Sequence, residues 1–428
     1  MPTNQPSSPE VYLNLNVRGM GQSATLAINE RSRQLMAEGK EIYRLGLGQS
    51  PFPVPDHVRE ALARNAHQKD YLPVKGLLAL REAITAWIQR TEDLNYHPDN
   101  IVVGPGTKEL MFLVQLVYYG DLVIPSPSWV SYAPQARIIG RQIHWLPTRP
   151  ETGLGVEPEV LEALCRKDPN RPRLMILNSP SNPTGLCYRE DRLSALSEVL
   201  RKYRVLAISD EIYSGTHFDN RHLSLARFYP EGTIISNGLS KWCGAGGWRL
   251  GFFAFPEGLS WLADAVAAVA SETFTSTSAP IQYAAVSAFD DNADMRFYLK
   301  HCRKILAVLS HHAYETLSTA GATMNRSAGG FYLFPSFEAM GNQLRAREMK
   351  TGQALCEHLL DESGVAILPG HCFGRPAAEL SARIAVVDFD GVHALSQAQT
   401  EIVNEAFIKR HCSRVTDAVE RLSEWVKD

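Results

Sequence analysis

The stretch Leu174-Met-Ile-Leu-Asn-Ser-Pro-Ser-Asn182-Pro-Thr-Gly185 places four apolar residues directly before a cluster of polar and turn-forming residues. The same arrangement returns in Val205-Leu-Ala-Ile-Ser-Asp210-Glu-Ile-Tyr213 and in Thr233-Ile-Ile-Ser-Asn-Gly-Leu-Ser240-Lys241. Continuous apolar runs of this length are typical of strands buried on both faces of a parallel sheet. Because ligands bind at the carboxyl ends of such strands, we expect the three polar clusters to lie together at one edge of a sheet.

Segments with a helical pattern separate the apolar runs between Ile101 and Phe255. This alternation predicts an α/β fold with a mostly parallel sheet that helices cover on its faces. Further strands are expected at Ile101–Val103, Leu122–Ile124 and Leu250–Phe255, and helices at Lys108–Val117, Pro158–Arg166 and Asp191–Tyr203.

The pattern changes after Phe255, where helices and short strands suggest a second, smaller α+β domain. We expect a large domain over residues 49–292, and a small domain made of residues 1–48 and 293–428, with the boundary at the start of a long helix. The helices expected outside the sheet are Ala24–Met36, Leu259–Ser271, Ile281–Phe289, Ala293–Ala320, Gly352–Leu360 and one from Gln397 onward, and the strands are Phe331–Phe334, Val365–Leu368 and Arg383–Val387.

The composition is that of an ordinary globular protein, with 428 residues, 45% hydrophobic and 21% charged. The 43 basic and 46 acidic residues leave no basic excess of the kind that binds nucleic acid or a membrane surface. Met1–Glu10 does not resemble a signal peptide, and the most apolar stretch, Leu110–Tyr119, is too short to cross a bilayer. Seven scattered cysteines without a CxxC pair favour reduced thiols and no metal site. We therefore expect a soluble, cytoplasmic protein.

Each polar cluster has a structural explanation when it is taken alone. Asn182-Pro-Thr-Gly185 is a typical turn, Asp210 could cap a helix, and Lys241 could be a surface charge. Their joint order along the chain is more specific. It is extended by Gly247-Trp-Arg249-Leu-Gly251, which places an arginine eight residues after Lys241.

With these motifs the chain resembles the class I/II aminotransferases, which are pyridoxal-phosphate (PLP) enzymes of the aspartate aminotransferase fold. The resemblance covers nearly the whole chain. Besides the clusters above, it rests on Ser23–Asn29, Leu45–Phe52, Tyr71–Gly76, Leu80–Arg81, Gly104–Lys108, Pro127–Tyr132, Gly329–Tyr332 and Ser381–Ile384.

The resemblance implies a catalytic role for three residues. Lys241 would hold PLP as a Schiff base and, once freed, would move a proton between the substrate Cα and the cofactor. Asp210 would keep the pyridine nitrogen protonated, so that the ring accepts electrons. Tyr213, together with Asn182, would donate hydrogen bonds to the phenolic oxygen and stabilise it as an anion.

The resemblance also implies how the cofactor phosphate is held. Gly106, Thr107 and Lys108 open a helix, so their backbone N–H groups can face an anion, and Lys108 is expected to use its backbone more than its charge. Ser240 and Arg249 would complete the phosphate site, the arginine as a two-pronged donor.

The remaining implied contacts concern the ring, the substrate and a second subunit. Trp129 would stack on the PLP ring and, with Asn182 and the backbone of Gly48, line the substrate site. Arg383 would bind the α-carboxylate, because a planar guanidinium matches carboxylate geometry. Tyr71 would reach the phosphate of a neighbouring subunit, in a homodimer with shared active sites.

Alternatives to this function remain open. Another PLP reaction on the same scaffold, such as β-elimination, decarboxylation or cyclisation, uses the same motifs. A PLP-binding transcription regulator would need a DNA-binding unit, but the segment before Gly48 is short and not basic. The amino acid and 2-oxo acid also stay open: residues 260–294, where one branch of the family carries a second arginine, contain no Arg or Lys. Gly238 departs from relatives that have Ser or Thr, so one phosphate hydroxyl is missing.

Overall fold

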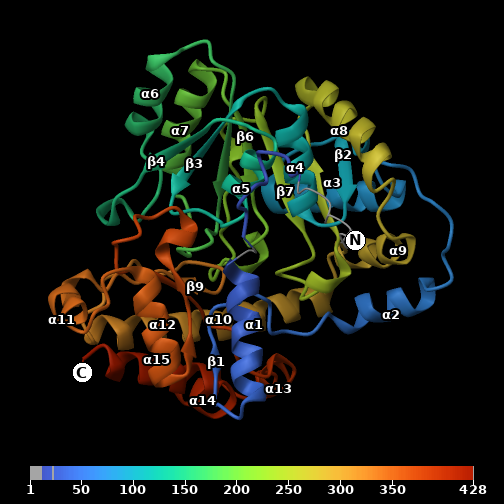
Figure 1. Ribbon diagram of the computed structural model, residues 1–428. Coiled ribbons are helices and arrows are strands. Elements are labelled where there is room, and N and C mark those ends of the chain that lie inside the picture. Colours follow the sequence, from blue (N-terminus) through green and yellow to red (C-terminus); the bar gives the residue numbers. More distant parts are fainter. Residues whose placement is uncertain (1–11, 22–23, 428) are drawn as a thin grey trace, which may run out of the picture.

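A seven-stranded sheet forms the centre of the computed structural model, which describes residues 12–21 and 24–427 (Figure 1). The strand order is β2-β8-β7-β6-β5-β3-β4, and β8 alone runs antiparallel to its two neighbours. The predicted mostly parallel α/β sheet is therefore confirmed. The strands are β2 (Ile101–Gly104), β3 (Asp121–Ser126), β4 (Ile143–Pro147), β5 (Arg173–Asn178), β6 (Leu206–Asp210), β7 (Thr233–Gly238) and β8 (Gly251–Ala254).

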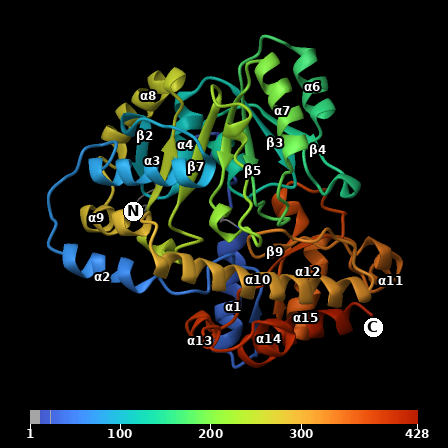
Figure 2. The same cartoon turned by 180° about the vertical axis from the view of Figure 1, so that it is seen from behind.

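Helices cover both faces of this sheet (Figures 1 and 2). Alternate strand residues point to opposite faces, so Val102 and Phe253 pack into one apolar cluster while Val103 and Phe252 pack into another. Burial on both faces explains why these strands read as continuous apolar runs. The first face is covered by α4 (Thr107–Val117), α5 (Tyr132–Ile138) and α8 (Ser260–Thr273), and the second by α3 (Leu78–Glu92), α6 (Pro158–Lys167) and α7 (Glu190–Lys202).

The C-terminal part packs beside the large sheet along the long helix α10 (Ala293–Thr319), together with the first helix of the chain (Figure 2). The N-terminal strand β1 (Tyr43–Arg44) pairs in parallel with β10 (Val365–Ala366), and β11 (Leu368–Pro369), β12 (Ala382–Ala385) and β9 (Tyr332–Leu333) form an antiparallel sheet. The helices of this part are α1 (Ala24–Ala37), α11 (Gly341–Ala346), α12 (Gly352–Ser363), α13 (Gly391–Gln397), α14 (Glu405–His411) and α15 (Ser413–Trp425), while α2 (Asp56–Asn65) packs on α9 (Ala279–Ala288).

Three sequence expectations differ from the structure. The helical stretch expected from Gln397 onward begins later, because α13 ends at Gln397 and α14 begins after Asn404, whose side chain caps it by accepting from Phe407 N–H; α15 follows. The strand expected over Val365–Leu368 is divided between two sheets. The edge strand β4 was not expected, because Ile143, His144 and Trp145 are only half-buried and give no continuous apolar run.

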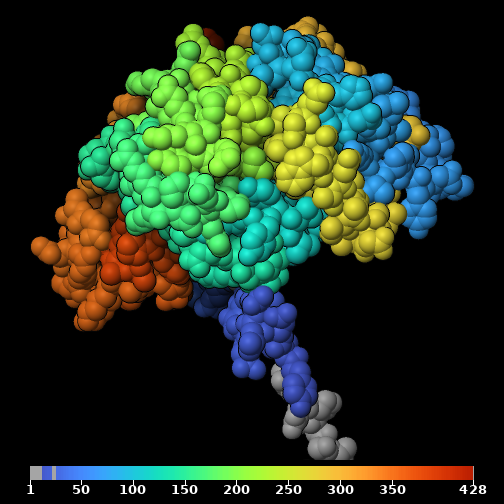
Figure 3. All heavy atoms as spheres, turned by 90° about the horizontal axis from the view of Figure 1, so that it is seen from above, coloured from blue at the N-terminus to red at the C-terminus, as the bar shows by residue number. Residues whose placement is uncertain are grey.

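The N-terminal segment differs from the rest of the chain in its exposure. Figure 3 shows its dark blue residues projecting from the body of the molecule. Leu13 and Leu15 on this segment are 53% and 77% exposed. No helix in the part of the chain that the structure describes combines the length and apolar character needed to cross a membrane.

Candidate active site

A cavity of about 480 Å³ lies at the carboxyl ends of β5, β6 and β7, where the three polar clusters of the sequence meet. The parallel direction of these strands brings their ends to one edge of the sheet. Most of the predicted site residues line this cavity: Gly48, Thr107, Lys108, Trp129, Asn182, Asp210, Tyr213, Ser240, Lys241, Arg249 and Arg383.

Lys241 lies in the turn after β7, and its Nζ donates a hydrogen bond to the carbonyl oxygen of Gly48 at 2.7 Å. The pKa of the Lys241 amine is lowered to about 8. Burial is the main cause, followed by the nearby cations Arg383 and Arg249, whereas Asp210 has a smaller opposite effect. The uncharged fraction of this amine near neutral pH is therefore larger than for an ordinary lysine, and an uncharged amine is the form that attacks a carbonyl carbon.

Asp210 is the last residue of β6, and its side chain is buried. The Tyr132 hydroxyl donates to its Oδ2 at 2.6 Å, and the Ile212 N–H donates to Oδ1 at 3.4 Å. Burial outweighs these hydrogen bonds and raises the pKa of Asp210 to about 6. A cation placed beside this carboxylate would favour its charged form. Tyr132 had no predicted role, although it ends the Pro127–Tyr132 motif.

Arg383 extends from β12 and is 1% exposed. Its Nη1 donates to Asn182 Oδ1 at 3.0 Å, and its Nη2 donates to the Gly46 carbonyl. The guanidinium carbon lies 4.6 Å from the ring centre of Tyr332 and 5.0 Å from that of Phe373. Its buried Nε has no hydrogen-bond partner among the described residues, so this planar group keeps a donor for an anion.

Tyr213 and Tyr332 share a hydrogen bond between their hydroxyl oxygens, 2.9 Å apart. Tyr332 lines the cavity but was not predicted as a site residue, although it ends the Gly329–Tyr332 motif. Gly48 faces this pair: a Cβ at residue 48 would lie 1.8 Å from the Tyr332 hydroxyl oxygen. Residue 48 must therefore be glycine for Tyr332 to occupy this position.

The other end of the cavity is rich in cations and helix N–H groups. Gly106 precedes α4 with φ +90°, and a Cβ there would lie 2.3 Å from Arg249 Nη2. The Lys108 ammonium lies 5.1 Å from the Trp129 ring centre, so its charge as well as its backbone belongs to the site. Burial, and then the charge of Arg249, lower the pKa of Lys108.

Gly238 stands where some relatives have the hydroxyl of Ser or Thr. It is the last residue of β7 and pairs with Gly251 of β8. A Cβ at this position would lie 2.7 Å from the Leu250 carbonyl oxygen. The backbone of β8 thus leaves no room for a serine or threonine side chain here.

Tyr71 lies apart from the other predicted residues. Its side chain is 90% exposed, and it is not among the residues that line the cavity within this chain. A role for Tyr71 at an active site therefore requires a second subunit.

The donor set of the cavity fits PLP. Lys108, Arg249 and the N–H groups at the start of α4 suit a phosphate dianion. The buried Asp210 suits the protonated pyridine nitrogen, and the amine of Lys241 suits the aldehyde carbon.

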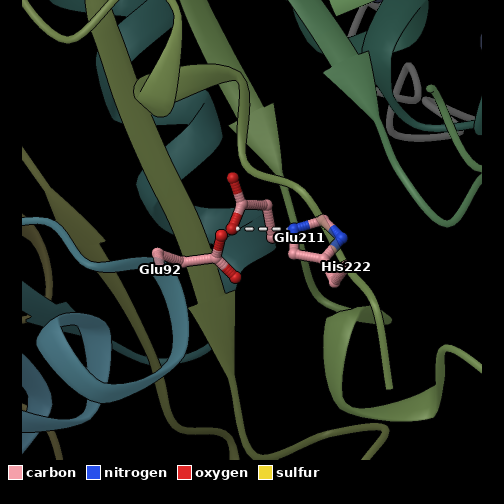
Figure 4. A group of neighbouring side chains, drawn as sticks. All are labelled: Glu92, Glu211 and His222. Carbon is pink, nitrogen blue, oxygen red and sulfur yellow. Dashed lines mark ion pairs between the residues drawn. The ribbon is translucent and has the colours of Figure 1, made fainter. Parts of the chain in front are cut away.

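Glu92, Glu211 and His222 form a buried charge cluster, and Glu211 is the residue next to Asp210 in the sequence (Figure 4). His222 Nε2 lies 3.1 Å from Glu211 Oε2. The Ser224 hydroxyl donates to Glu211, and the Ser224 N–H and Arg227 Nε each donate to Glu92 at 3.1 Å. Burial, and then Glu211, raise the pKa of Glu92 to about 7. Both carboxylates of the cluster thus accept hydrogen bonds from neighbouring groups of the same chain.

Comparisons with known proteins agree with this geometry. Residues 40–395 match the family model described as aminotransferase class I and II. The chain is 33% identical over 370 residues to an aspartate aminotransferase of Geobacillus stearothermophilus, which covers 84% of this chain and 91% of that protein. It is 30% identical to an asparagine–oxo-acid transaminase of Streptococcus mutans over 85% of this chain and 92% of that protein.

A solved structure of an aspartate aminotransferase from Thermus thermophilus with maleate superposes with a TM-score of 0.83 at 27% identity, covering 97% of this chain and all of that one. A family match over most of the chain and a shared architecture agree with a site that fits PLP. The chain therefore belongs to the aminotransferase class I and II family and is a PLP-dependent transaminase.

Proposed function

We propose that this enzyme moves the amino group of an L-amino acid to a 2-oxo acid with Lys241 as the residue that binds PLP covalently. The observation that carries this proposal is that Lys241, Asp210 and Arg383 face one cavity from separate parts of the chain. An amine of lowered pKa, a buried carboxylate and a planar cation are the groups that this reaction needs.

PLP, when bound, accepts the electron pair that remains after the substrate Cα loses its proton. The residues of this chain would do the rest. Arg383 would hold the α-carboxylate through its free guanidinium N–H groups, and its Nη1 donates to Asn182 Oδ1, which orients it. The Lys241 Nζ would take the proton from the substrate Cα and deliver it to the carbon of the cofactor that is bonded to the transferred nitrogen. Asp210 would hold a positive charge on the ring nitrogen, and Tyr213 would donate to the phenolic oxygen.

The cation-rich end of the cavity would hold the phosphate of PLP. Its donors are the N–H groups of Thr107 and Lys108, next to Gly106, and the side chains of Ser240 and Arg249. Trp129 offers a ring face and would cover one side of the cofactor. The support is that these residues line the cavity, or border it in the case of Gly106, whose missing Cβ leaves space for Arg249.

We also propose a homodimer in which Tyr71 reaches the phosphate site of the partner. Three observations support it. Tyr71 is 90% exposed, Trp261 is 54% exposed, and the apolar Leu13 and Leu15 lie on a segment that projects from the body (Figure 3). These side chains are therefore available for contact with a partner subunit. Seven free cysteines support a location in the reducing cytoplasm.

The relatives suggest which substrates to try first. Their names refer to aspartate, prephenate and asparagine. L-Aspartate with 2-oxoglutarate is therefore the first pair, followed by asparagine as donor and prephenate as acceptor. Product analysis distinguishes transamination from the alternative lyase chemistry, because a transaminase forms one new amino acid for each 2-oxo acid consumed.

The covalent role of Lys241 is tested by borohydride reduction of the purified enzyme followed by peptide mapping. We expect visible absorbance before reduction and a single labelled peptide that contains Lys241. Lys241→Ala should lose the label, whereas Lys300→Ala, on the surface of α10, should keep it. A label on another lysine would disprove the assignment, and release of free ammonia without a new amino acid would disprove transamination.

A further inference from the structure

Tyr332 contacts both Arg383 and Tyr213, two residues for which the sequence predicted separate roles. We propose that Tyr332 is a positioning residue that links the carboxylate-binding Arg383 to the Tyr213 hydroxyl, and so sets how strongly Tyr213 donates to the phenolic oxygen of PLP. The inference rests on the proposed function, because it assumes that PLP binds beside Tyr213.

The position of Tyr332 follows from strand pairing. Its strand β9 runs antiparallel to β12, the strand that carries Arg383, and Tyr332 pairs with Ala385. This places the Tyr332 ring 4.6 Å from the guanidinium carbon, a distance at which a cation is attracted to a ring face. Phe373 lies near the same guanidinium at 5.0 Å, so two rings hold Arg383.

The Tyr332 hydroxyl is held in place as well. It lies 2.9 Å from the Tyr213 hydroxyl, and the two rings meet edge to face at 77°. It occupies the space that a side chain at Gly48 would fill, since a Cβ there would lie 1.8 Å from the hydroxyl oxygen and 2.6 Å from Cζ. With a 1% exposed side chain, Tyr332 has no water-facing alternative for this hydrogen bond.

The charges around the pair decide the direction of the hydrogen bond. Burial raises the pKa of both tyrosines, and the Arg383 cation lowers it for both. For Tyr332 this cation is the largest effect after burial, whereas for Tyr213 the neighbouring Tyr332 and Asp210 also raise the pKa. The contact of the Tyr332 ring with the Arg383 guanidinium at 4.6 Å therefore favours Tyr332 as the donor of the shared hydrogen bond. If Tyr332 donates to the Tyr213 oxygen, the Tyr213 proton is left for the cofactor, and each bond of such a chain strengthens the next.

This connection gives Arg383 an influence beyond carboxylate binding. A carboxylate bound to Arg383 compensates its positive charge, and Tyr332 then becomes a weaker donor. Substrate binding would thus reach the phenolic oxygen through Tyr332, in addition to the Asn182 contact that Arg383 already makes.

The test measures the visible absorbance of the PLP-bound enzyme against pH, with and without saturating maleate. Tyr332→Phe removes the hydroxyl and keeps the ring. The pKa of the chromophore should rise by roughly 0.2 to 0.6 unit, as expected for a change of 10–30% in one charge-assisted hydrogen bond. The shift that maleate causes should become smaller. Tyr298→Phe is the matched control, because the Tyr298 hydroxyl is also buried but donates to the Pro53 carbonyl outside the cavity.

A double-mutant cycle with Tyr213→Phe tests the route. Without the Tyr213 hydroxyl, Tyr332→Phe should cause no further change in the chromophore pKa. The same pKa in Tyr332→Phe and wild type, or an equal shift in both backgrounds, would overturn the proposal. If Tyr332→Phe does not fold, Tyr332→3-fluorotyrosine keeps the shape with a more acidic hydroxyl and should lower the chromophore pKa, whereas an unchanged value would count against the link.

These outcomes also separate this inference from the proposed function. If the purified enzyme has no visible absorbance, or borohydride labels another lysine, the proposed function fails. If Lys241 is labelled and the chromophore titrates normally but does not respond to Tyr332, only the link between Arg383 and Tyr213 is disproved.

Discussion

Asp210→Asn should increase the stability of the cofactor-free protein at high pH and decrease the catalytic activity of the PLP-bound enzyme. Asp210 is 4% exposed, and burial raises the pKa of its carboxyl from 3.8 to about 6. A rise of about two units corresponds to about 3 kcal/mol. The pKa of Asp210 is higher in the folded than in the unfolded protein, so the folded protein is more stable when this carboxyl is protonated. This contribution to stability is fully present below pH 3.8 and is lost as the pH rises through about 6.

At pH 8 the cofactor-free enzyme therefore contains an ionised and buried carboxylate that the asparagine variant lacks. Relative to wild type, the free energy of unfolding of Asp210→Asn should change in its favour by up to about 3 kcal/mol between pH 4 and pH 8. In the PLP-bound enzyme, a neutral amide cannot hold the ring nitrogen protonated. The loss of a similar free energy from the transition state corresponds to a decrease in kcat/KM of about 100-fold or more.

The assay combines urea titrations of the cofactor-free proteins at several pH values with kcat/KM for the best amino donor. The exposed Asp290→Asn serves as the control, and it should leave both quantities unchanged. Turnover of Asp210→Asn close to wild type would refute the catalytic role of the carboxylate. A pH dependence of stability equal to that of wild type would refute the argument from burial.

Three further predictions concern other charged groups and the subunit interface. Arg383→Lys should raise KM for amino and 2-oxo acids of every side chain alike, because a point charge replaces the planar donor; a loss confined to acidic substrates would contradict this. The raised pKa of Glu92, about 7, means that its stabilisation is lost as the pH rises through 7. The unfolding free energy of the wild type should therefore decrease by up to about 3 kcal/mol between pH 5 and 8.5 because of Glu92. This decrease should be absent in Glu92→Gln and present in the surface variant Glu60→Gln. Refolding Lys241→Ala together with Tyr71→Asp should give hybrid dimers more active than either parent, whereas confirmed hybrids without a gain would exclude shared sites.

Local patterns predicted the central sheet well, because its strands are buried on both faces and stand out as apolar runs between turns. The edge strand Ile143–Pro147 pairs on one side only, and its half-buried residues carry no such signal. The helices near residues 56–65 and 78–92 were also not predicted. The domain boundary at residue 293 stays a prediction, as do the roles assigned to single residues of the site.

The sequence by itself predicted the groups that we propose carry the chemistry. Asn182, Asp210 and Lys241 each follow an apolar run, and parallel strands must bring such ends together. Only the tertiary structure showed the partners of these groups. The Tyr132 hydroxyl reaches Asp210 across 78 residues, and Tyr332 reaches Tyr213 across 119. Such contacts depend on the packing of distant elements, and no local pattern records them. Burial is decided in the same way: it sets the pKa of Lys241 near 8 and that of Asp210 near 6, because desolvation depends on everything that surrounds a charge.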